Sequence, residues 1–284
     1  MNKWIIGARP RTLPAAVAPV VVATALAGSD ASLFPALLAL IVSLSLQVGV
    51  NYANDYSDGI RGTDKDRVGP TRITASGLAT PASVKAAAFI SFGVGAVAGL
   101  GLAVMTSWWL IAVGLISILA AWGYTGGKNP YGYLGLGELF VFIFFGVVAT
   151  VGTFYVQTES ITANSVLASI PMGTFACALL AINNIRDRAL DAPAGKKTLA
   201  VRLGDRKARY FFVALIVLGY LAVLAMGKPW ALLTLITLPV ALQLIRGVLG
   251  NAQGRELIPF LAKTGQLQLL FALTFSLSLV LSHG

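Results

Sequence analysis

Long apolar runs recur along almost the whole chain and constrain its fold more than any other feature. They lie near residues 13–28, 34–52, 84–104, 107–123, 137–157, 164–183, 208–226, 229–247 and 265–282. Most come close to the ~20 residues that a helix needs to cross the hydrocarbon core of a bilayer. The strands of a membrane β-barrel alternate apolar and polar residues, and these runs do not. The sequence therefore predicts an all-α, polytopic membrane protein with nine transmembrane helices in a bundle.

Charged residues are scarce and lie mostly on one side of the predicted membrane. Only 11% of the 284 residues are charged, whereas soluble domains have about 25%. The formal net charge of +10 raises the question of a nucleic-acid partner. If the N-terminus is cytoplasmic, however, every Lys and Arg except Lys228 falls in a cytoplasmic segment, as the positive-inside rule predicts. The basic charge therefore indicates orientation among membrane lipids and, second, a phosphate-rich ligand, and we expect no nucleic-acid partner.

The single cysteine and the single histidine argue against several chemistries. Cys177 lies inside an apolar run, so the sequence predicts no internal disulfide and no thiolate metal cluster. His283 lies on the predicted outer side, far from the polar segments. This position argues against a Ser-His-Asp hydrolase and against zinc catalysis.

Two predicted cytoplasmic connections, 53–83 and 184–207, are long and hold most of the polar residues. Three positions of the first recur 132 residues later, because Asn51, Asp55 and Lys65 correspond to Asn183, Asp187 and Lys197. Such a repeat is typical of a duplicated membrane fold. We therefore expect one membrane-embedded domain over 1–284, with four-helix halves at about 1–130 and 131–247 and an extra helix at 265–282.

Each long connection begins with acidic and amide side chains at the end of an apolar run. In the first, a helix would place four residues on one face, since they are three or four residues apart: Asn51, Asn54, Asp55 and Asp58. In the second, the same spacing relates Asp187 and Asp191, with Asn183 or Asn184 one turn below. Helix caps and solvated loop charges are the commonest roles of such residues. Those roles do not explain two clusters in register.

Magnesium chemistry explains the two clusters better. Mg²⁺ prefers a few carboxylate oxygens and completes its shell with waters and substrate phosphates. The candidate metal ligands and catalytic residues are Asp55, Asp58, Asp187 and Asp191, with Asp64 as a further catalytic candidate. Basic side chains nearby would neutralise the rest of a bound diphosphate, namely Lys65, Arg67, Arg72, Lys196, Lys197 and Arg202.

The order and membrane placement of these residues resemble the UbiA superfamily of intramembrane aromatic prenyltransferases, whose two Asp-rich motifs follow the second and sixth helices. The resemblance extends over essentially the whole chain. It rests on the segments 8–14, 54–58, 130–138, 183–187 and 201–204, together with Gly62, Asp64, Arg67, Gly69, Pro70, Arg72, Tyr124, Asp191, Gly195, Lys196 and Thr198. Gly62 stands where the wider superfamily has a third Asp, and Asp64 follows two residues later, which leaves the role of Asp64 open.

The resemblance, which is strongest to the naphthoate branch, implies an activity and a location. The implied reaction transfers a polyprenyl chain from a polyprenyl diphosphate to 1,4-dihydroxy-2-naphthoate, with Mg²⁺ as cofactor. Carbon dioxide, pyrophosphate and a proton leave, and the product is demethylmenaquinone. The implied location is the bacterial cytoplasmic (inner) membrane, with the N-terminus and the active-site loops cytoplasmic.

The resemblance also implies roles for individual residues. The expected substrate-binding set is Asn51, Asn54, Lys65, Arg67, Arg72, Tyr124, Lys128, Tyr131, Asn183, Asn184, Lys196 and Arg202. Aromatic faces would tolerate an allylic cation, and the candidates are Tyr52, Tyr56, Tyr124, Tyr131 and Tyr133. Lys128 or Arg9 is expected to bind the acceptor carboxylate, and Asp64, Glu138 or a pyrophosphate oxygen to take the proton.

Two alternatives stay open at this point. An internal duplication with polar clusters at helix ends is also a transporter design, although transport requires a polar path to both membrane faces. A related prenyltransferase could instead use another acceptor, such as 4-hydroxybenzoate, homogentisate or haem.

Overall fold

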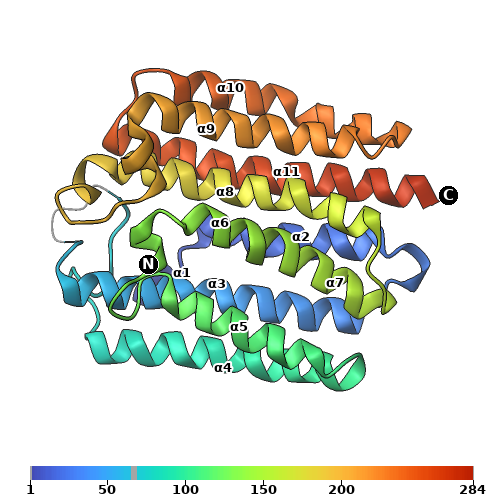
Figure 1. Ribbon diagram of the computed structural model, residues 1–284, viewed down its shortest axis with the longest axis horizontal. Helices are drawn as coiled ribbons and strands as arrows, with labels where there is room; N and C mark the ends of the chain where they lie inside the picture. Colours follow the sequence, from blue (N-terminus) through green and yellow to red (C-terminus); the bar gives the residue numbers. More distant parts are fainter. Residues whose placement is uncertain (1, 65–68, 284) are drawn as a thin grey trace.

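A computed structural model describes residues 2–64 and 69–283. Within these ranges all regular secondary structure is helical, and the long helices run side by side along the longest axis of the molecule (Figure 1). The α-helices are α1 (Lys3–Ala8), α2 (Pro14–Leu26), α3 (Leu33–Arg61), α4 (Pro81–Met105), α5 (Trp109–Gly123), α6 (Gly137–Val141), α7 (Ala149–Thr158), α8 (Ala163–Asp191), α9 (Leu199–Leu224), α10 (Leu238–Leu249) and α11 (Ile258–His283). The shorter elements are η1 (Pro10–Thr12), η2 (Gly28–Asp30), η3 (Tyr131–Leu134), η4 (Phe142–Val148), η5 (Pro229–Thr237) and η6 (Gly254–Leu257).

The predicted apolar runs all fall on helical segments, but the predicted count of nine spans is not confirmed. In the described residues, seven segments are long and apolar enough to cross a membrane. An eighth span arises if Lys3–Thr12 and Pro14–Leu26, which meet at a 53° bend, are counted together. The run 107–123 forms α5, whose 15 residues are shorter than a standard span. The fold is therefore an all-helical, multi-pass membrane bundle with seven or eight clear spans.

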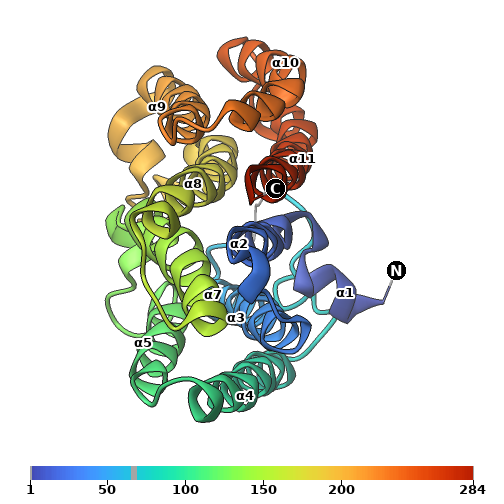
Figure 2. The same cartoon turned by 90° about the vertical axis from the view of Figure 1, so that its right-hand side faces the viewer.

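The helices pack in two groups with α2 and α7 between them (Figure 2). One group consists of α3, α4 and α5, and the other of α8, α9, α10 and α11. The largest apolar core joins α2, α8, α9 and α11 and contains the fully buried rings of Phe175, Phe212, Phe271 and Phe275. The predicted division into repeated halves stays a prediction.

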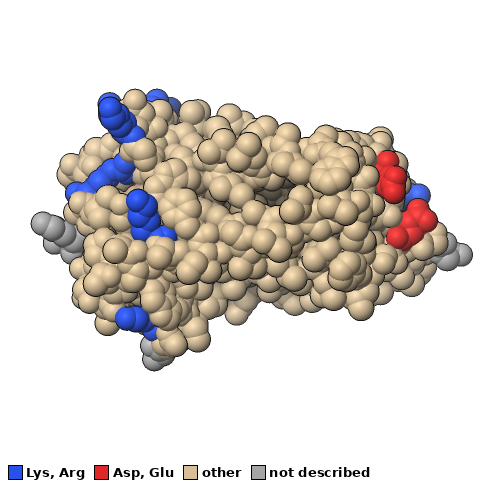
Figure 3. Space-filling model, turned by 90° about the horizontal axis from the view of Figure 1, so that it is seen from below, with Lys and Arg blue, Asp and Glu red and all other residues tan. Residues whose placement is uncertain are grey.

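Charge separates the two ends of the molecule and leaves its middle apolar. On the face in Figure 3, Lys and Arg gather at the end that carries the long connections, and no charged residue lies in the band between the ends. Large apolar side chains such as Ile90, Val97 and Ile236 are more than 60% exposed. In a soluble protein such exposure would be costly, whereas lipid tails solvate these groups well. The surface is therefore that of a protein embedded in a bilayer.

The span over residues 137–158 is interrupted by a π-helical stretch. This stretch, η4, continues α6 and is followed directly by α7. At its centre, Gly146 packs so closely on α8 that a Cβ added there would lie 2.7 Å from the Cα of Gly173. π-Helical turns are frequent at functional sites. The wall that η4 forms with α8 is therefore a candidate part of such a site.

Replacing Gly146 with Ala should destabilise the bundle, since the added methyl group meets backbone that cannot turn away. We expect a loss of about 1–3 kcal/mol in the free energy of unfolding, seen as a lower melting temperature in detergent. Gly152→Ala in α7 is the matched control, because no atom lies within 4 Å of its added Cβ. An unchanged melting temperature for Gly146→Ala would contradict the close packing of η4 on α8.

Candidate active site

A cavity of ≈ 650 Å³ lies between the two groups of helices. Its apolar part is lined by residues of α3, α4, α5, η4 and α7. Its polar part lies near the long connections, where the C-terminal ends of α3 and α8 both face it. Polar and basic residues on this part of the wall include Asn51, Asn54, Asp58, Arg72, Asn183, Asn184, Arg186, Asp187, Asp191 and Lys196.

Most of the predicted site residues are brought together on this wall. They include the residues just named, except Arg186, together with Tyr124 and Tyr131. Among the described residues, eight predicted positions do not line the cavity, namely Tyr52, Asp55, Tyr56, Asp64, Lys128, Glu138, Lys197 and Arg202. Lys65 and Arg67 lie outside the described residues.

Asp58 is the centre of a buried polar cluster that joins the end of α3 to the connection after α8. Lys196 donates to one of its carboxylate oxygens (2.9 Å) and the Tyr133 hydroxyl donates to the other (2.6 Å). The side chains of Asp58 and Lys196 are only 5% and 8% exposed. Lys196 and Arg61 also lie over the Tyr133 ring, 5.1 and 5.3 Å from its centroid.

The protonation of this cluster follows from its surroundings. Burial lowers the pKa of Lys196, but the Asp58 carboxylate and the other neighbouring acidic groups outweigh burial and raise the pKa above its ordinary value. Burial and Asp58 together raise the pKa of the Tyr133 phenol. Near neutral pH, Lys196 is therefore a cation and Tyr133 a neutral hydrogen-bond donor.

Asp187 is held by its sequence neighbour on α8. Arg186 donates to both carboxylate oxygens of Asp187 (2.7 and 2.6 Å) and also to the side-chain oxygen of Asn183 (2.8 Å). One turn away, the side-chain amide of Asn184 donates to Glu138 of α6 (3.0 Å). Arg186 thus holds the side chains of Asp187 and Asn183 in place. From the sequence, Arg186 was identified only as one residue of the motif 183–187.

Asp55 and Asp64 lie behind the cavity wall rather than on it. The Asp55 carboxylate is fully buried and accepts hydrogen bonds from the backbone N–H groups of Ile73 and Thr74 (3.1 and 2.9 Å). Asp64 forms an ion pair with Arg72 (3.4 Å). Both carboxylates therefore position the segment that carries Arg72, which does line the cavity.

Lys128 and Arg202 are exposed and lie away from the cavity. The guanidinium of Arg202 donates to the backbone carbonyl of Lys197 (3.2 Å), so it caps a loop. In contrast, Thr125 was not predicted and does line the cavity, where its hydroxyl donates to the side-chain oxygen of Asn54 (2.7 Å). No sequence pattern indicated this contact, because its partners are 71 residues apart.

An aromatic cluster borders the polar part of the cavity. The Tyr131 ring stacks on Phe140 (centroids 3.9 Å apart) and meets Tyr124 edge to face at 5.5 Å. Phe144 continues the row, stacked beyond Phe140. Burial raises the pKa values of Tyr124 and Tyr131 well above those of free phenols, so both remain neutral. The rings offer an electron-rich wall that can tolerate positive charge in a ligand.

Comparison with known proteins places the chain in a family. The profile of the UbiA prenyltransferase family matches residues 16–262. The chain belongs to this family. It is 51% identical to the 1,4-dihydroxy-2-naphthoate octaprenyltransferase of Mycobacterium tuberculosis over 95% of this chain and 94% of that protein. It is 37% identical to the enzyme of the same name from Escherichia coli, over 99% and 96% of the two chains.

Solved structures of UbiA homologues share the fold. A homologue from Archaeoglobus fulgidus bound to GPP and Mg²⁺ covers 98% of this chain and 99% of its own, with a TM-score of 0.63 at 14% identity. The apo structure of a homologue from Aeropyrum pernix has a TM-score of 0.68 at 15% identity over 95% and 97% of the two chains. The predicted resemblance to the UbiA superfamily is therefore confirmed, and the protein is a prenyltransferase of this family.

The donor set of this UbiA-family site fits a hard divalent cation that shares its ligands with a substrate. The cavity offers the carboxylates of Asp58, Asp187 and Asp191 and several amide oxygens. Among the described residues, no group of three or more His, Cys, Asp and Glu side chains could hold a metal alone. Mg²⁺ commonly binds through one or two carboxylates, with phosphates and waters completing its shell. The residues present thus suit an ion that arrives with a diphosphate.

Lys196→Met should leave the Asp58 carboxylate buried without its cation. We expect the rate of prenyl transfer to fall roughly 100-fold, and the melting temperature to fall as well. Lys196→Arg should retain part of the rate and part of the thermal stability. Because the folded-state pKa of Lys196 is raised, its contribution to stability is present below the ordinary value of 10.5 and is lost only as pH rises past the folded value. The melting-temperature difference between wild type and Lys196→Met should therefore stay constant from about pH 6 to about pH 9. If the melting-temperature difference disappears within this pH range, the ion pair between Lys196 and Asp58 is contradicted.

Proposed function

We propose that this chain transfers a polyprenyl group from a polyprenyl diphosphate to 1,4-dihydroxy-2-naphthoate. One observation carries the proposal: the acidic ends of α3 and α8 face a single cavity whose remaining wall is apolar and aromatic. Such a cavity suits a ligand with a diphosphate at one end and a long hydrocarbon chain at the other. The naphthoate acceptor is supported by the relatives from M. tuberculosis and E. coli, which carry that specificity in their names.

The diphosphate would bind at the polar part of the cavity with Mg²⁺. Asp58, Asp187 and Asp191 are the residues that we expect to hold the ion, with Asn54 or Asn183 as amide ligands. The ligand role predicted for Asp55 stays a prediction, since in the described conformation Asp55 holds the loop that carries Arg72. When bound, Mg²⁺ would offset the negative charge of the departing pyrophosphate.

The cationic residues of the site would assist the departure of pyrophosphate. The bond between the allylic carbon and the diphosphate oxygen breaks, and its electron pair goes to the pyrophosphate. Lys196, Arg186 and Arg72 line the cavity and can donate charge-assisted hydrogen bonds to this group. The aromatic cluster around Tyr131 and Phe140 would face the allylic cation, and the apolar wall would exclude water from it.

The acceptor would then attack the cation with the ring carbon that carries its carboxylate. A new carbon–carbon bond forms, carbon dioxide leaves, and the electron pair of the broken bond returns to the ring. The direct product is the quinol form of demethylmenaquinone. An acceptor that binds as a carboxylate needs no protein base for this step. Asp64 and Glu138 would accordingly act by positioning Arg72 and Asn184, with which they form contacts.

The prenyl chain would extend into the apolar part of the cavity. Its wall there includes Val42, Leu102, Leu110, Val148 and Val156. The basic end of the molecule would face the cytoplasm, which is consistent with the positive-inside rule for a bacterial cytoplasmic membrane. The diphosphate headgroup would then approach from the side on which soluble metabolites are made.

Incubation of the purified protein with 1,4-dihydroxy-2-naphthoate and a long-chain polyprenyl diphosphate should give prenylated product with Mg²⁺ and none with EDTA. Asp58→Asn and Asp187→Asn should each lower turnover roughly 100-fold or more, because each removes a carboxylate from the diphosphate end. Asp30→Asn is the control, since Asp30 is exposed at the opposite end of the molecule. Near-normal turnover in both cavity variants would refute the site.

Competition between acceptors tests the specificity. With equal concentrations of 1,4-dihydroxy-2-naphthoate and 4-hydroxybenzoate, we expect the prenylated product to derive almost entirely from the naphthoate, measured by chromatography of the extracted quinols. The larger bicyclic acceptor covers more of the aromatic wall and buries more apolar surface. Preferential prenylation of 4-hydroxybenzoate would support the alternative acceptor class instead.

A further inference from the structure

Arg9 has a backbone conformation that is unusual for its residue type. Its φ and ψ are 52° and 70°, in the left-handed region, where an L side chain is strained. Among the described non-glycine residues, only Arg9 and Glu159 have a positive φ. Glu159 lies in an exposed turn, whereas Arg9 is partly buried and lines the cavity. Strained residues of this kind cluster at ligand sites.

A dense hydrogen-bond network holds the strained turn in place. The backbone N–H and the hydroxyl of Thr12 both donate to the carbonyl of Arg9 (2.9 and 3.0 Å). The Thr12 hydroxyl oxygen accepts in turn from the side-chain amides of Gln47 (3.0 Å) and Asn51 (3.1 Å), so all its bonding capacity is used. Asn51 also donates to the carbonyl of Ala8 (2.9 Å). Three polar side chains thus stabilise one main-chain turn.

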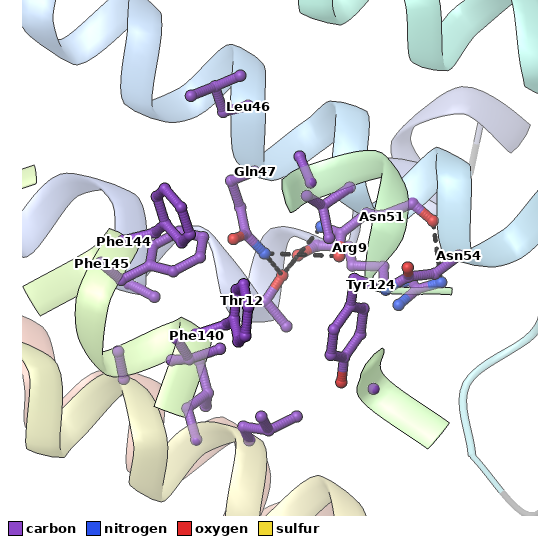
Figure 4. Close-up of a pocket in the computed structure, with 18 of the residues that line it drawn as sticks. Arg9, Thr12, Leu46, Gln47, Asn51, Asn54, Tyr124, Phe140, Phe144 and Phe145 are labelled. Atoms are coloured by element: carbon purple, nitrogen blue, oxygen red, sulfur yellow. Dashed lines mark hydrogen bonds between the residues drawn. The ribbon is translucent and has the colours of Figure 1, made fainter. Parts of the chain in front are cut away.

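The result of this network is the placement of the Arg9 guanidinium. Its Nη2 donates to the main-chain carbonyl of Asn51 (3.0 Å) on α3. Figure 4 shows Arg9, Asn51 and Asn54 at one part of the pocket, with the ring of Tyr124 beside them and the ring of Phe140 near Thr12. A guanidinium is permanently charged and presents a planar fork of donors that matches a carboxylate. The site therefore places an anion-binding group next to aromatic rings.

We propose that Arg9 binds the carboxylate of the aromatic acceptor and so orients the ring carbon that is prenylated. The inference rests on the proposed function. The cations that we assign to the diphosphate, Lys196, Arg186 and Arg72, come from α8 and from the connections after α3 and α8, whereas Arg9 belongs to the N-terminal segment. Of the two residues that the sequence suggested for this carboxylate, Lys128 is exposed outside the cavity. The geometry thus favours Arg9.

The backbone of Arg9 gives a sharp test, because glycine is the residue best suited to a left-handed conformation. Arg9→Gly should keep or raise the melting temperature while removing the guanidinium. We expect the KM for 1,4-dihydroxy-2-naphthoate to rise roughly 10- to 100-fold, as for the loss of a charge-assisted hydrogen-bonded pair. The KM for the polyprenyl diphosphate should stay within about twofold. Arg9→Lys should recover part of the loss, and Arg206→Ala, at an exposed position of α9, is the control.

An acceptor analogue without a carboxylate separates binding from a structural role. 1,4-Dihydroxynaphthalene should bind wild type and Arg9→Gly with equal affinity, measured by quenching of intrinsic tryptophan fluorescence, whereas the naphthoate should bind the variant more weakly. Equal weakening of both ligands would overturn the inference, as would a rise in KM for the diphosphate alone. If the wild-type protein neither binds nor prenylates the naphthoate, the proposed function fails. If it does both and Arg9→Gly behaves like wild type, only the role of Arg9 fails.

Discussion

The buried contact between Asp58 and Lys196 joins the two acidic segments of the site across 138 residues of sequence. Taking both charges out of water costs several kcal/mol per ion, and their attraction repays this cost only when the geometry is good. An apolar pair of similar volume would hold α3 and the connection after α8 together at least as well. Stability alone therefore does not account for the pair. The position of the pair accounts for it better, because the pair keeps an anion and a cation together in the polar part of the cavity wall.

The position and length of the apolar runs predicted the helices of this chain well, because lipid requires every span to satisfy its own backbone hydrogen bonds. The predicted count of nine spans was not confirmed. The run 107–123 includes a turn before Trp109, so only 15 of its residues form α5. The run near the N-terminus is likewise bent, since Arg9 leaves the helical conformation before Pro10 and Pro14 restart it. Apolar composition alone does not reveal such breaks.

Helical spacing predicted that the ends of α3 and α8 present polar groups on one face, and these ends do line one cavity, but the spacing could not predict what covers each group. Asp55 and Asp58 are close in sequence, yet the loop over Ile73 and Thr74 covers the first, whereas the second faces the cavity. Lys128 was expected in the site from the family resemblance, and its place on an exposed turn depends on tertiary packing. Thr125 entered the site through a contact that no local pattern encodes, because its partner Asn54 is 71 residues away, whereas Arg186 contacts its own sequence neighbour.

Charge balance at the cavity offers a physical reason for a divalent cation. Lys196, Arg186 and Arg72 are each already paired with a carboxylate, respectively Asp58, Asp187 and Asp64. A bare diphosphate would therefore bring uncompensated negative charge into a region of low dielectric, where such charge is costly. In the proposed reaction, a diphosphate that arrives with Mg²⁺ would bring most of its compensation with it, and Asp58 and Asp187 would be available to hold the ion. Lys196 and Arg186 would then be the residues that stabilise the negative charge of the pyrophosphate.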